Sequence, residues 1–321
     1  MNTASTGEIQ LVITERAEIA TDIFMFEMRR ADDSALPEFT PGSHITVTAP
    51  SGQKRRYSLC NDSCERDRYV IAVKREQTGR GGSLSFTTAI KIGDRILIEP
   101  PANEFEMSKQ EPKTYVFIAG GIGITPIRSM ILDCLRRSKD NFRLYYFTRS
   151  PQMMAFRDEF SSARFSDKVV LHCDGGDPAQ AYDLWPVLEE QRGAHLYCCG
   201  PRGLMDAVRD MTGHWSDSSV HFEDFVGASA PRADDRPFEV RLARSGKTYD
   251  VPPGVSILDM LRRNGHILPS SCESGTCGTC RTRFTAGEPD HRDLVLTDSE
   301  KRTELMICVS RARTPSLTLD I

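Results

Sequence analysis

The chain has 321 residues and a formal net charge of −4, with 41 Lys and Arg against 45 Asp and Glu. This length predicts two or three domains, and the mixed charge lacks the basic stripe of a nucleic-acid binder or the basic helix of a membrane-surface protein. No segment approaches the roughly 18 apolar residues of a membrane span, and residues 1–10 lack the apolar core of a signal peptide. We therefore expect a cytoplasmic protein whose ten cysteines are not a disulfide scaffold.

Residues 1–110 carry the alternating apolar pattern of short strands. The pattern recurs in "HITVTAP", "RRYSLC", "RYVIAVKRE" and "DRILIEP", with Pro, Gly and Asp between them. Almost nothing in this region has helical spacing. We therefore expect a small antiparallel β-barrel.

Residues 111–226 alternate between strands and helices. We interpret "TYVFIAG", "FRLYYFTR", "KVVLHCD", "AHLYCCG" and "SVHFEDF" as strands, whereas residues 125–138 have apolar side chains at helical spacing. This alternation predicts an α/β domain with a doubly wound parallel sheet.

The segment "AGGIGITPI" lies directly after the first of these strands and directly before the helix, which is the context of a dinucleotide-binding loop. We expect Gly121 and Gly123 to let a phosphate approach the backbone, and Thr125 to cap the helix. Pro126 suits the first helical turn, so that the helix N terminus would face a pyrophosphate. Pro126 also replaces the third glycine of the usual fingerprint, and a tight turn without a ligand is the alternative interpretation.

The segment "YCCGPRG" ends a later strand at the same expected edge. Ligands of doubly wound sheets collect at the carboxyl ends of the strands, which would place Cys199 beside a nicotinamide. The alternative is that Cys199 belongs to the core, as we expect for Cys198. The expected dinucleotide-binding residues are Gly120, Gly121, Gly123, Thr125, Cys199, Gly200 and Pro201.

Residues 227–236 have the polar, proline-bearing composition of a linker. Residues 237–321 follow as a short α+β domain built around a cysteine-rich loop.

Three cysteines of this loop, Cys272, Cys277 and Cys280, have the C-x4-C-x2-C spacing of plant-type 2Fe–2S ferredoxins. The fourth ligand of such a cluster comes from a distant strand, and Cys308 in the apolar segment "LMICVSRA" can supply it. Glycines within the loop permit the tight turns that it needs. Zinc, or thiols that are free or disulfide-bonded, are the alternatives.

In this order, "RRYSLCND", "GRGGS", "AGGIGITP", "YCCGP" and the cysteine set resemble the ferredoxin–NAD(P) reductase superfamily with a fused plant-type ferredoxin. The domain order resembles that of the phthalate dioxygenase reductase family in particular, over the whole chain. The resemblance implies a flavin barrel, a nicotinamide domain and a C-terminal ferredoxin.

The resemblance implies FMN on the barrel. FAD is the alternative, but no segment is evident for contacts to its adenine. The residue types fit, because arginine can clamp a phosphate, glycine amides can bind an anion, and tyrosine offers a flat face to the flavin. For Phe225 the alternative is an ordinary core residue. The implied flavin-binding residues are Arg55, Arg56, Tyr57, Ser58, Ala72, Val73, Lys74, Gly81, Gly82, Ser83 and Phe225.

The implied activity is electron transfer from NADH through FMN and the 2Fe–2S cluster to a Rieske-type aromatic-ring oxygenase, such as phthalate dioxygenase. The cofactors carry this chemistry, so no catalytic side chain is expected. The partner contact would be transient and the reductase a monomer. One alternative is the reductase of an O-demethylase or another Rieske monooxygenase, and another, of a different class, is a redox-sensing binding module.

Two expectations concern recognition. An acid after the second strand of a nucleotide domain normally binds the ribose 2′-hydroxyl, but this chain has Arg149 and Ser150 there; we expect NADH from the resemblance. The acids near the cysteine loop form a hypothetical docking surface, with a solvated rim as the alternative. These acids are Glu273, Glu288, Asp290 and Asp293.

Overall fold

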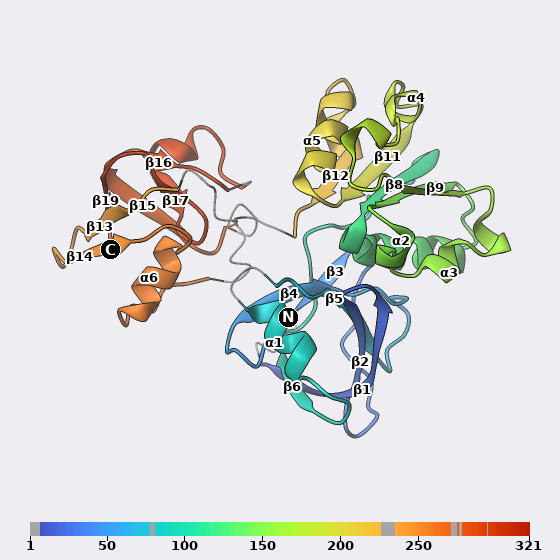
Figure 1. Cartoon of the computed structure of the whole chain (residues 1–321), viewed down its shortest axis with the longest axis horizontal. Helices are drawn as coiled ribbons and strands as arrows, with labels where there is room; N and C mark the ends of the chain where they lie inside the picture. Colours follow the sequence, from blue (N-terminus) through green and yellow to red (C-terminus); the bar gives the residue numbers. More distant parts are fainter. Residues whose placement is uncertain (1–6, 78–80, 226–234, 271–274, 276–277, 294) are drawn as a thin grey trace. The chain divides into compact units, whose positions relative to one another are not determined.

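The computed structural model describes residues 7–77, 81–225, 235–270, 275, 278–293 and 295–321. The chain divides into two compact units, Met1–Glu223 and Asp224–Ile321, which we call unit 1 and unit 2 (Figure 1). Most of the expected linker, residues 227–234, lies outside the described residues, as do Cys272, Glu273 and Cys277.

Unit 1 begins with an antiparallel sheet of seven strands in the order β4-β3-β6-β1-β2-β5, with β7 paired to β3. An isolated bridge between Leu59 and Ile71 brings the two ends of this order together. Apolar side chains such as Phe26 and Ile45 fill the interior. The predicted barrel is therefore confirmed. Its strands are β1 (Ile9–Ala20), β2 (Ile23–Arg29), β3 (Ser43–Thr48), β4 (Lys54–Ser58), β5 (Tyr69–Lys74), β6 (Arg95–Ile98) and β7 (Ala102–Asn103).

A helix that the sequence did not indicate, α1 (Gly82–Ala89), follows β5. Its sequence has weak helical periodicity, and its threonines disfavour a helix. Tertiary packing compensates, because Phe86 is fully buried with its ring 4.9 Å from that of Phe26. The hydroxyl of Thr87 also donates to the carbonyl oxygen of Ser83 at 2.8 Å.

The second part of unit 1 is a parallel sheet of five strands in the order β10-β9-β8-β11-β12. Helices α2 and α3 lie on one side of it, and α4 and α5 lie on the other (Figure 1). The predicted doubly wound domain is confirmed. Its elements are β8 (Thr114–Gly120), α2 (Ile124–Arg136), β9 (Phe142–Thr148), α3 (Arg157–Phe160), β10 (Val169–Cys173), α4 (Trp185–Leu188), β11 (Ala194–Cys199), α5 (Arg202–Met211) and β12 (Val220–Glu223).

Alternate residues of these strands enter two different cores. On β11, Leu196 and Cys198 pack under α4 and α5, whereas Tyr197 and Cys199 pack on the α2 side. The core on the α2 side continues into the barrel through Ile23 and other side chains. The barrel and the parallel sheet thus share one continuous apolar layer.

The described residues of unit 2 form a five-stranded sheet in the order β14-β13-β19-β15-β17, a short β16-β18 ladder, the α-helix α6 and a short 3-10 turn at Glu300–Arg302. Only the β13–β19 pair within that sheet is parallel. Apolar side chains of the helix, including Ile257 and Leu261, pack into the core of this sheet. The predicted α+β fold is confirmed. Its elements are β13 (Phe238–Leu242), β14 (Thr248–Val251), α6 (Ile257–Arg263), β15 (Arg281–Ala286), β16 (Pro289–Asp290), β17 (Glu304–Met306), β18 (Arg311–Ala312) and β19 (Ser316–Leu319).

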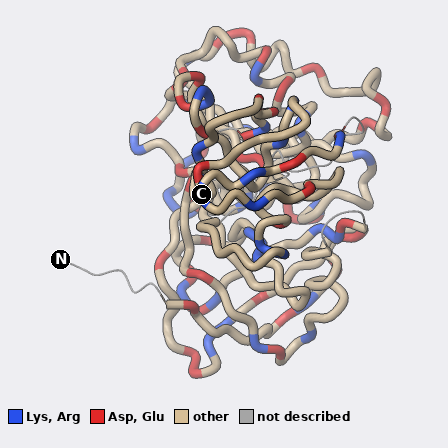
Figure 2. Tube along the Cα trace, turned by 90° about the vertical axis from the view of Figure 1, so that its left-hand side faces the viewer, with Lys and Arg blue, Asp and Glu red and all other residues tan. Residues whose placement is uncertain are grey.

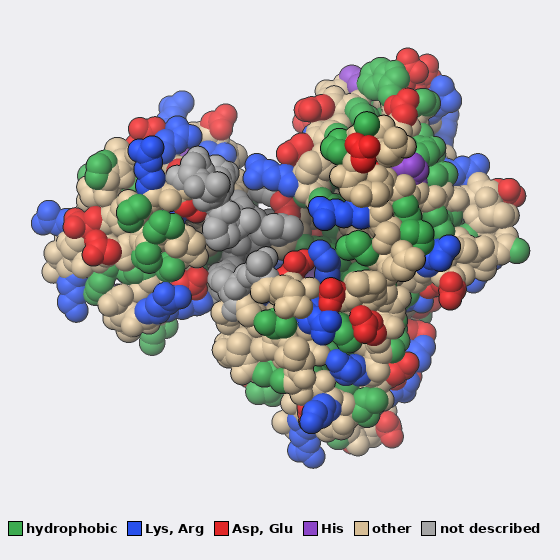
Figure 3. All heavy atoms as spheres, viewed as in Figure 1, with side chains coloured by type: hydrophobic (Ala, Val, Ile, Leu, Met, Phe, Trp, Pro, Cys, Tyr) green, Lys and Arg blue, Asp and Glu red, His purple; other side chains and the backbone are tan. Residues whose placement is uncertain are grey.

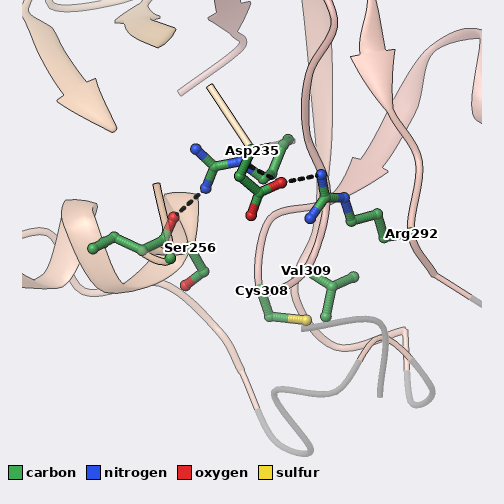
Figure 4. Close-up of a pocket in the computed structure, with 8 residues that line it drawn as sticks. Asp235, Ser256, Arg292, Cys308 and Val309 are labelled. Carbon is green, nitrogen blue, oxygen red and sulfur yellow. Dashed lines mark hydrogen bonds and ion pairs between the residues drawn. The ribbon is translucent and has the colours of Figure 1, made fainter. Parts of the chain in front are cut away.

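A group of buried ion pairs holds Asp235, which lies within the expected linker 227–236, against the rest of unit 2 (Figure 4). The carboxylate of Asp235 lies 2.5 Å from Nη2 of Arg292 and 3.6 Å from Nε of Arg311. Arg292 also pairs with Asp290 at 2.6 Å, and Arg311 donates to the carbonyl oxygen of Val255 at 2.7 Å. All four charges satisfy one another inside this unit.

Basic and acidic residues are interspersed along the trace in Figure 2, and the face shown in Figure 3 carries both signs without an extended basic patch. This distribution agrees with the charge pattern of the sequence. Among the described residues, no helix is both long and apolar enough to span a membrane.

We expect Asp235→Ala to destabilise unit 2 by about 3–5 kcal/mol, because it leaves two buried guanidinium groups with one carboxylate. Hydrogen exchange should show lost protection in peptides covering 238–263. Unfolding followed by tryptophan fluorescence should stay unchanged, because Trp185 and Trp215 both lie in unit 1. The control is Asp320→Ala, which removes an exposed partner 3.5 Å from Arg244 and should cost no more than about 1 kcal/mol. Equal effects of the two substitutions would contradict the prediction.

Candidate functional site

The loops that follow β8 and β11 pack against each other at the carboxyl edge of the parallel sheet. A Cβ on Gly200 would lie 2.9 Å from the Cα of Gly120, and a Cβ on Gly123 would lie 2.1 Å from the carbonyl oxygen of Cys199. No side chain fits at these positions. The two glycine motifs, which are far apart in the sequence, therefore form one structure.

Gly121 has a different environment from its neighbours. Its φ is +54°, and nothing lies within 4 Å of where a Cβ would be. Glycine is needed here for backbone conformation, whereas Gly123 is needed for packing. Of the two glycines predicted to admit a phosphate, only Gly121 has open space beside it.

Helix α2 starts with Gly123 as its N-cap and has no side-chain cap, so the predicted capping role of Thr125 is wrong. Thr125 lies inside the first turn and is buried, and its hydroxyl donates to the carbonyl oxygen of Ile122 at 3.0 Å. The short 3-10 turn Gly121–Gly123 leads directly into the helix, so that the cap lies two residues before the expected position, at Gly123 instead of Thr125. Pro126 occupies the first turn as predicted. The uncapped N–H groups can bind an anion.

Cys199 ends β11 and is fully buried in the core shared with the barrel. The core position, one of the two alternatives, is therefore the one observed, and the position beside a nicotinamide stays a prediction. Pro201 is exposed and precedes α5 as its N-cap. Phe225 lies two residues beyond β12, and 37% of its surface is exposed.

The four residues of "RRYS" alternate along β4. Tyr57 pairs with Ile45, whose side chain lies in the barrel core, and it packs against that core. Arg56 and Ser58 belong to the opposite face, where Arg56 lies 2.8 Å from Glu104. The structure therefore assigns these four residues to two faces of one strand.

The hydroxyl of Tyr57 is buried and has no hydrogen-bond partner among the described residues. Burial raises the pKa of this phenol to about 12, and its ring lies 5.7 Å from that of Phe86. An unsatisfied buried hydroxyl is costly. This environment fits a bound group that supplies the missing partner, as a flavin would.

The start of α1 adjoins Arg55. A Cβ on Gly82 would lie 2.6 Å from Nε of that arginine, and Gly81 precedes the helix with a φ of +79°. The hydroxyl of Ser83 accepts a hydrogen bond from the N–H of Glu76 at 3.2 Å. A guanidinium beside an uncapped helix start fits a phosphate group.

The three residues carried over from "IAVK" have different surroundings. Ala72 lies in the core shared with the parallel sheet, and Val73 points into the barrel core. Lys74 forms an ion pair with Glu76 at 2.7 Å. The side chains of Ala72 and Val73 are thus buried, whereas that of Lys74 is 37% exposed.

Glu223, at the end of β12, joins the two halves of unit 1. Its Oε2 accepts a hydrogen bond from the hydroxyl of Ser58 at 3.3 Å. Burial raises the pKa of this carboxyl to about 8, although Arg56 and Ser58 act in the opposite direction. At pH 7 it is therefore mostly neutral and can donate as well as accept. Sequence reasoning missed this residue, although an acid at the carboxyl end of the last parallel strand is a usable signal.

Two of the predicted cluster ligands are described, Cys280 and Cys308, and both are buried. Their segments adjoin, because the N–H of Ile307 donates to the carbonyl oxygen of Cys280 at 3.4 Å. Gly275 and Gly278 have φ values of +80° and +78°, as a tightly wound loop requires. Cys308 follows β17 and lies near Val309 in Figure 4. These thiols fit a cluster, although no group of three or more possible metal ligands occurs among the described residues.

The three described acids of the docking hypothesis, Glu288, Asp290 and Asp293, do not form an exposed cluster, and Glu273 lies outside the described residues. The side chain of Asp293 is 0% exposed, and Asp290 pairs with the buried Arg292. Glu288 is exposed and pairs with Arg313 at 3.4 Å. That hypothesis is wrong for Asp290 and Asp293, because both carboxylates stabilise the fold of unit 2.

Comparison with known protein families matches three domain models to this chain. The oxidoreductase FAD-binding domain matches residues 10–107, the oxidoreductase NAD-binding domain matches residues 117–210, and the 2Fe-2S iron-sulfur cluster binding domain matches residues 240–313. The order of the matches is the order expected from the motifs.

Full-length relatives are also similar. Phthalate dioxygenase reductase of Burkholderia cepacia is 49% identical over 316 residues, covering 98% of each chain. The phthalate 4,5-dioxygenase oxygenase reductase subunit of Pseudomonas putida is 50% identical over 316 residues, covering 98% of this chain and 97% of its own. A solved phthalate dioxygenase reductase, described as a modular structure for electron transfer from pyridine nucleotides to 2Fe–2S, superposes with a TM-score of 0.85 at 49% identity over 98% of each chain.

The raised pKa of Glu223 predicts a pH-dependent stability of unit 1. The folded state keeps this proton to about pH 8, whereas an unfolded glutamate loses it near its ordinary pKa of 4.5. The contribution is therefore present in acid and lost as the pH rises between these values. Glu223→Gln removes it, so the variant should gain stability relative to the parent over that interval, by up to about 1.4 kcal/mol per pH unit. Thermal unfolding from pH 4 to pH 9 tests this, and a pH-independent difference would contradict it.

Proposed function

This chain belongs to the phthalate dioxygenase reductase family, and on that premise we propose that it is the NADH-dependent reductase of a Rieske-type aromatic-ring oxygenase, with phthalate dioxygenase as the favoured partner. It is an oxidoreductase with flavin, NAD and 2Fe–2S domains. The observation that carries the proposal is the hydrogen bond between Ser58 and Glu223. It joins the strand with the flavin-type motif to the last strand of the nucleotide sheet, which supports placing the two proposed sites next to each other.

The nucleotide would bind at the carboxyl edge of the parallel sheet. The uncapped N terminus of α2 and the open backbone at Gly121 suit its pyrophosphate. Glu223 and Cys199 end β12 and β11 at this same edge. A nicotinamide extending past them would reach the "RRYS" strand.

We propose FMN as the flavin, on family membership and on the absence of an evident adenine-binding segment in the sequence. Arg55 and the start of α1 would hold its phosphate, and the unpaired hydroxyl of Tyr57 would bond to the bound group. When bound, the flavin takes two electrons together from NADH and gives them up singly to a one-electron carrier. Mass spectrometry of the released flavin distinguishes FMN from FAD.

We propose that Cys272, Cys277, Cys280 and Cys308 hold the 2Fe–2S cluster in a domain spanning 237–321, after a flavin domain at 1–110, a nucleotide domain at 111–226 and a linker at 227–236. Transient contact with the oxygenase and a monomeric, cytoplasmic protein complete the proposal. A reductase of an O-demethylase is less favoured, because the relatives near half identity serve phthalate dioxygenation. A pure redox sensor is less favoured too, since it needs no nicotinamide site.

Cys308→Ala should abolish the visible absorption and the reduced-state EPR signal of the cluster, because all four thiolates are required. NADH should still bleach the flavin at the parental rate, since that step precedes the cluster. Reduction of the partner oxygenase should be lost. Cys64→Ala is the matched control, because this cysteine is exposed and lies in unit 1. A full EPR signal in Cys308→Ala would show that another residue is the ligand.

Cofactor choice gives a second prediction. Arg149 and Ser150 follow β9 in place of the usual acid, and Arg149 is exposed. We expect kcat/KM to favour NADH over NADPH. Introducing the acid as Ser150→Asp should raise that preference about ten-fold, equivalent to about 1.4 kcal/mol, by repelling the 2′-phosphate. A parental preference for NADPH would sink the NADH assignment without affecting the electron-transfer role.

A further inference from the structure

Helix α2 is bonded directly to the loop that follows β4. Nη1 of Arg128 donates to the carbonyl oxygen of Cys60 at 2.6 Å, and the hydroxyl of Ser129 donates to that of Asn61 at 2.9 Å. Both donors lie about one turn from the N terminus that faces the proposed nucleotide site. These two bonds tie the nucleotide helix to the barrel.

The loop they hold belongs to the flavin-type strands. The N–H of Cys60 donates to the carbonyl oxygen of Val70 at 2.9 Å, and the N–H of Val70 donates to Oδ1 of Asn61 at 3.0 Å. Cys60 lies two residues after Ser58, and Val70 lies in β5. The loop therefore fixes β4 relative to β5 and cannot shift without moving both strands.

Arg128 is itself held in one orientation. Its Nε donates to Oε2 of Glu159 at 2.7 Å, and its guanidinium lies 4.6 Å from the ring centre of Phe156. Phe156 adopts a left-handed backbone with a φ of +57°, which is unfavourable for an aromatic residue. The guanidinium plane thus meets a carboxylate, a ring and a carbonyl oxygen together, a set of contacts that lysine cannot reproduce.

We propose that Arg128 is a positioning residue for the transfer of electrons from NADH to the flavin, a role that rests on the proposed function. It sets the spacing between the helix that would hold the pyrophosphate and the strands that would hold the flavin. Apolar contacts alone would let helix α2 slide against the barrel, because they have no preferred direction. The hydrogen bond from Arg128 to Cys60 has a preferred direction and therefore fixes the position of the helix. Displacing reacting groups by about 1 Å can cost about 100-fold in rate, so a small shift of α2 would lower the rate of flavin reduction.

The test is anaerobic stopped-flow reduction of the holoprotein by NADH, comparing the parent with Arg128→Met and Arg128→Lys. We expect Arg128→Met to lower the limiting rate of flavin reduction at least about 10-fold, with the Kd for NADH unchanged within about two-fold. The long-wavelength charge-transfer absorbance of the nicotinamide–flavin complex should weaken in parallel. Arg128→Lys should be intermediate, because it keeps the charge and loses the planar contacts.

The matched control is Arg137→Met at the other end of α2. Arg137 is half exposed and pairs with Asp133 of its own helix at 2.8 Å, so the rate and the absorbance should stay parental. If Arg128→Met does not fold, Arg128→Lys and Ser129→Ala decide the outcome. A parental rate and charge-transfer band in the folded variants would overturn the proposal, and so would a raised Kd for NADH with an unchanged limiting rate. A parent whose flavin NADH does not reduce would refute the proposed function instead.

Discussion

The apolar layer shared by the barrel and the parallel sheet is the constraint on which unit 1 depends. Ile23 and Ala72 of the barrel pack in the same cluster as Phe117 and Tyr197 of the sheet, so neither half can bury its surface alone. Directional bonds can then act at the edges of this layer, where water would otherwise compete for them. The proposed sites for nucleotide and flavin lie at such an edge, which explains how two separate folds can present cofactors to each other.

Close-packed glycines and a buried acid with a raised pKa lie together at this edge of the sheet. The β8 and β11 loops approach so closely that a Cβ on Gly123 would overlap the carbonyl of Cys199, and that closeness brings the strand ends together. Glu223 is then surrounded deeply enough to keep its proton near neutral pH. The charge of Arg56 lowers this pKa, yet desolvation outweighs it, because Arg56 is already paired with Glu104. The raised pKa of Glu223 therefore results mainly from close packing at this edge and less from any one charged neighbour.

Patterns that depend on neighbours in the sequence were predicted well. The alternation along "TYVFIAG" and the spacing in residues 125–138 identified β8 and α2, because burial there repeats with the period of the element. Features fixed by tertiary contact were missed or wrong. Helix α1 depends on the packing of Phe86 into the barrel. The 3-10 turn before α2 makes Gly123 the N-cap in place of Thr125. Asp293 is buried within the fold of unit 2. Glu223 and Ser58 are 165 residues apart, a separation at which one sequence carries no pairing signal.

The ion pairs around Asp235 bear on how such a domain could be exchanged between proteins. A recombination point at residue 237, where the composition changes, would discard Asp235 and also Arg236, whose carbonyl oxygen accepts a hydrogen bond from Arg311 at 3.0 Å. The transferred domain would then contain the buried Arg292 and Arg311 without the carboxylate of Asp235 that both contact. A domain that keeps its stability after transfer to another protein has to start before Asp235. The N-terminal boundary of this domain is thus set by its buried ion pairs, and it lies upstream of the first strand of the sheet.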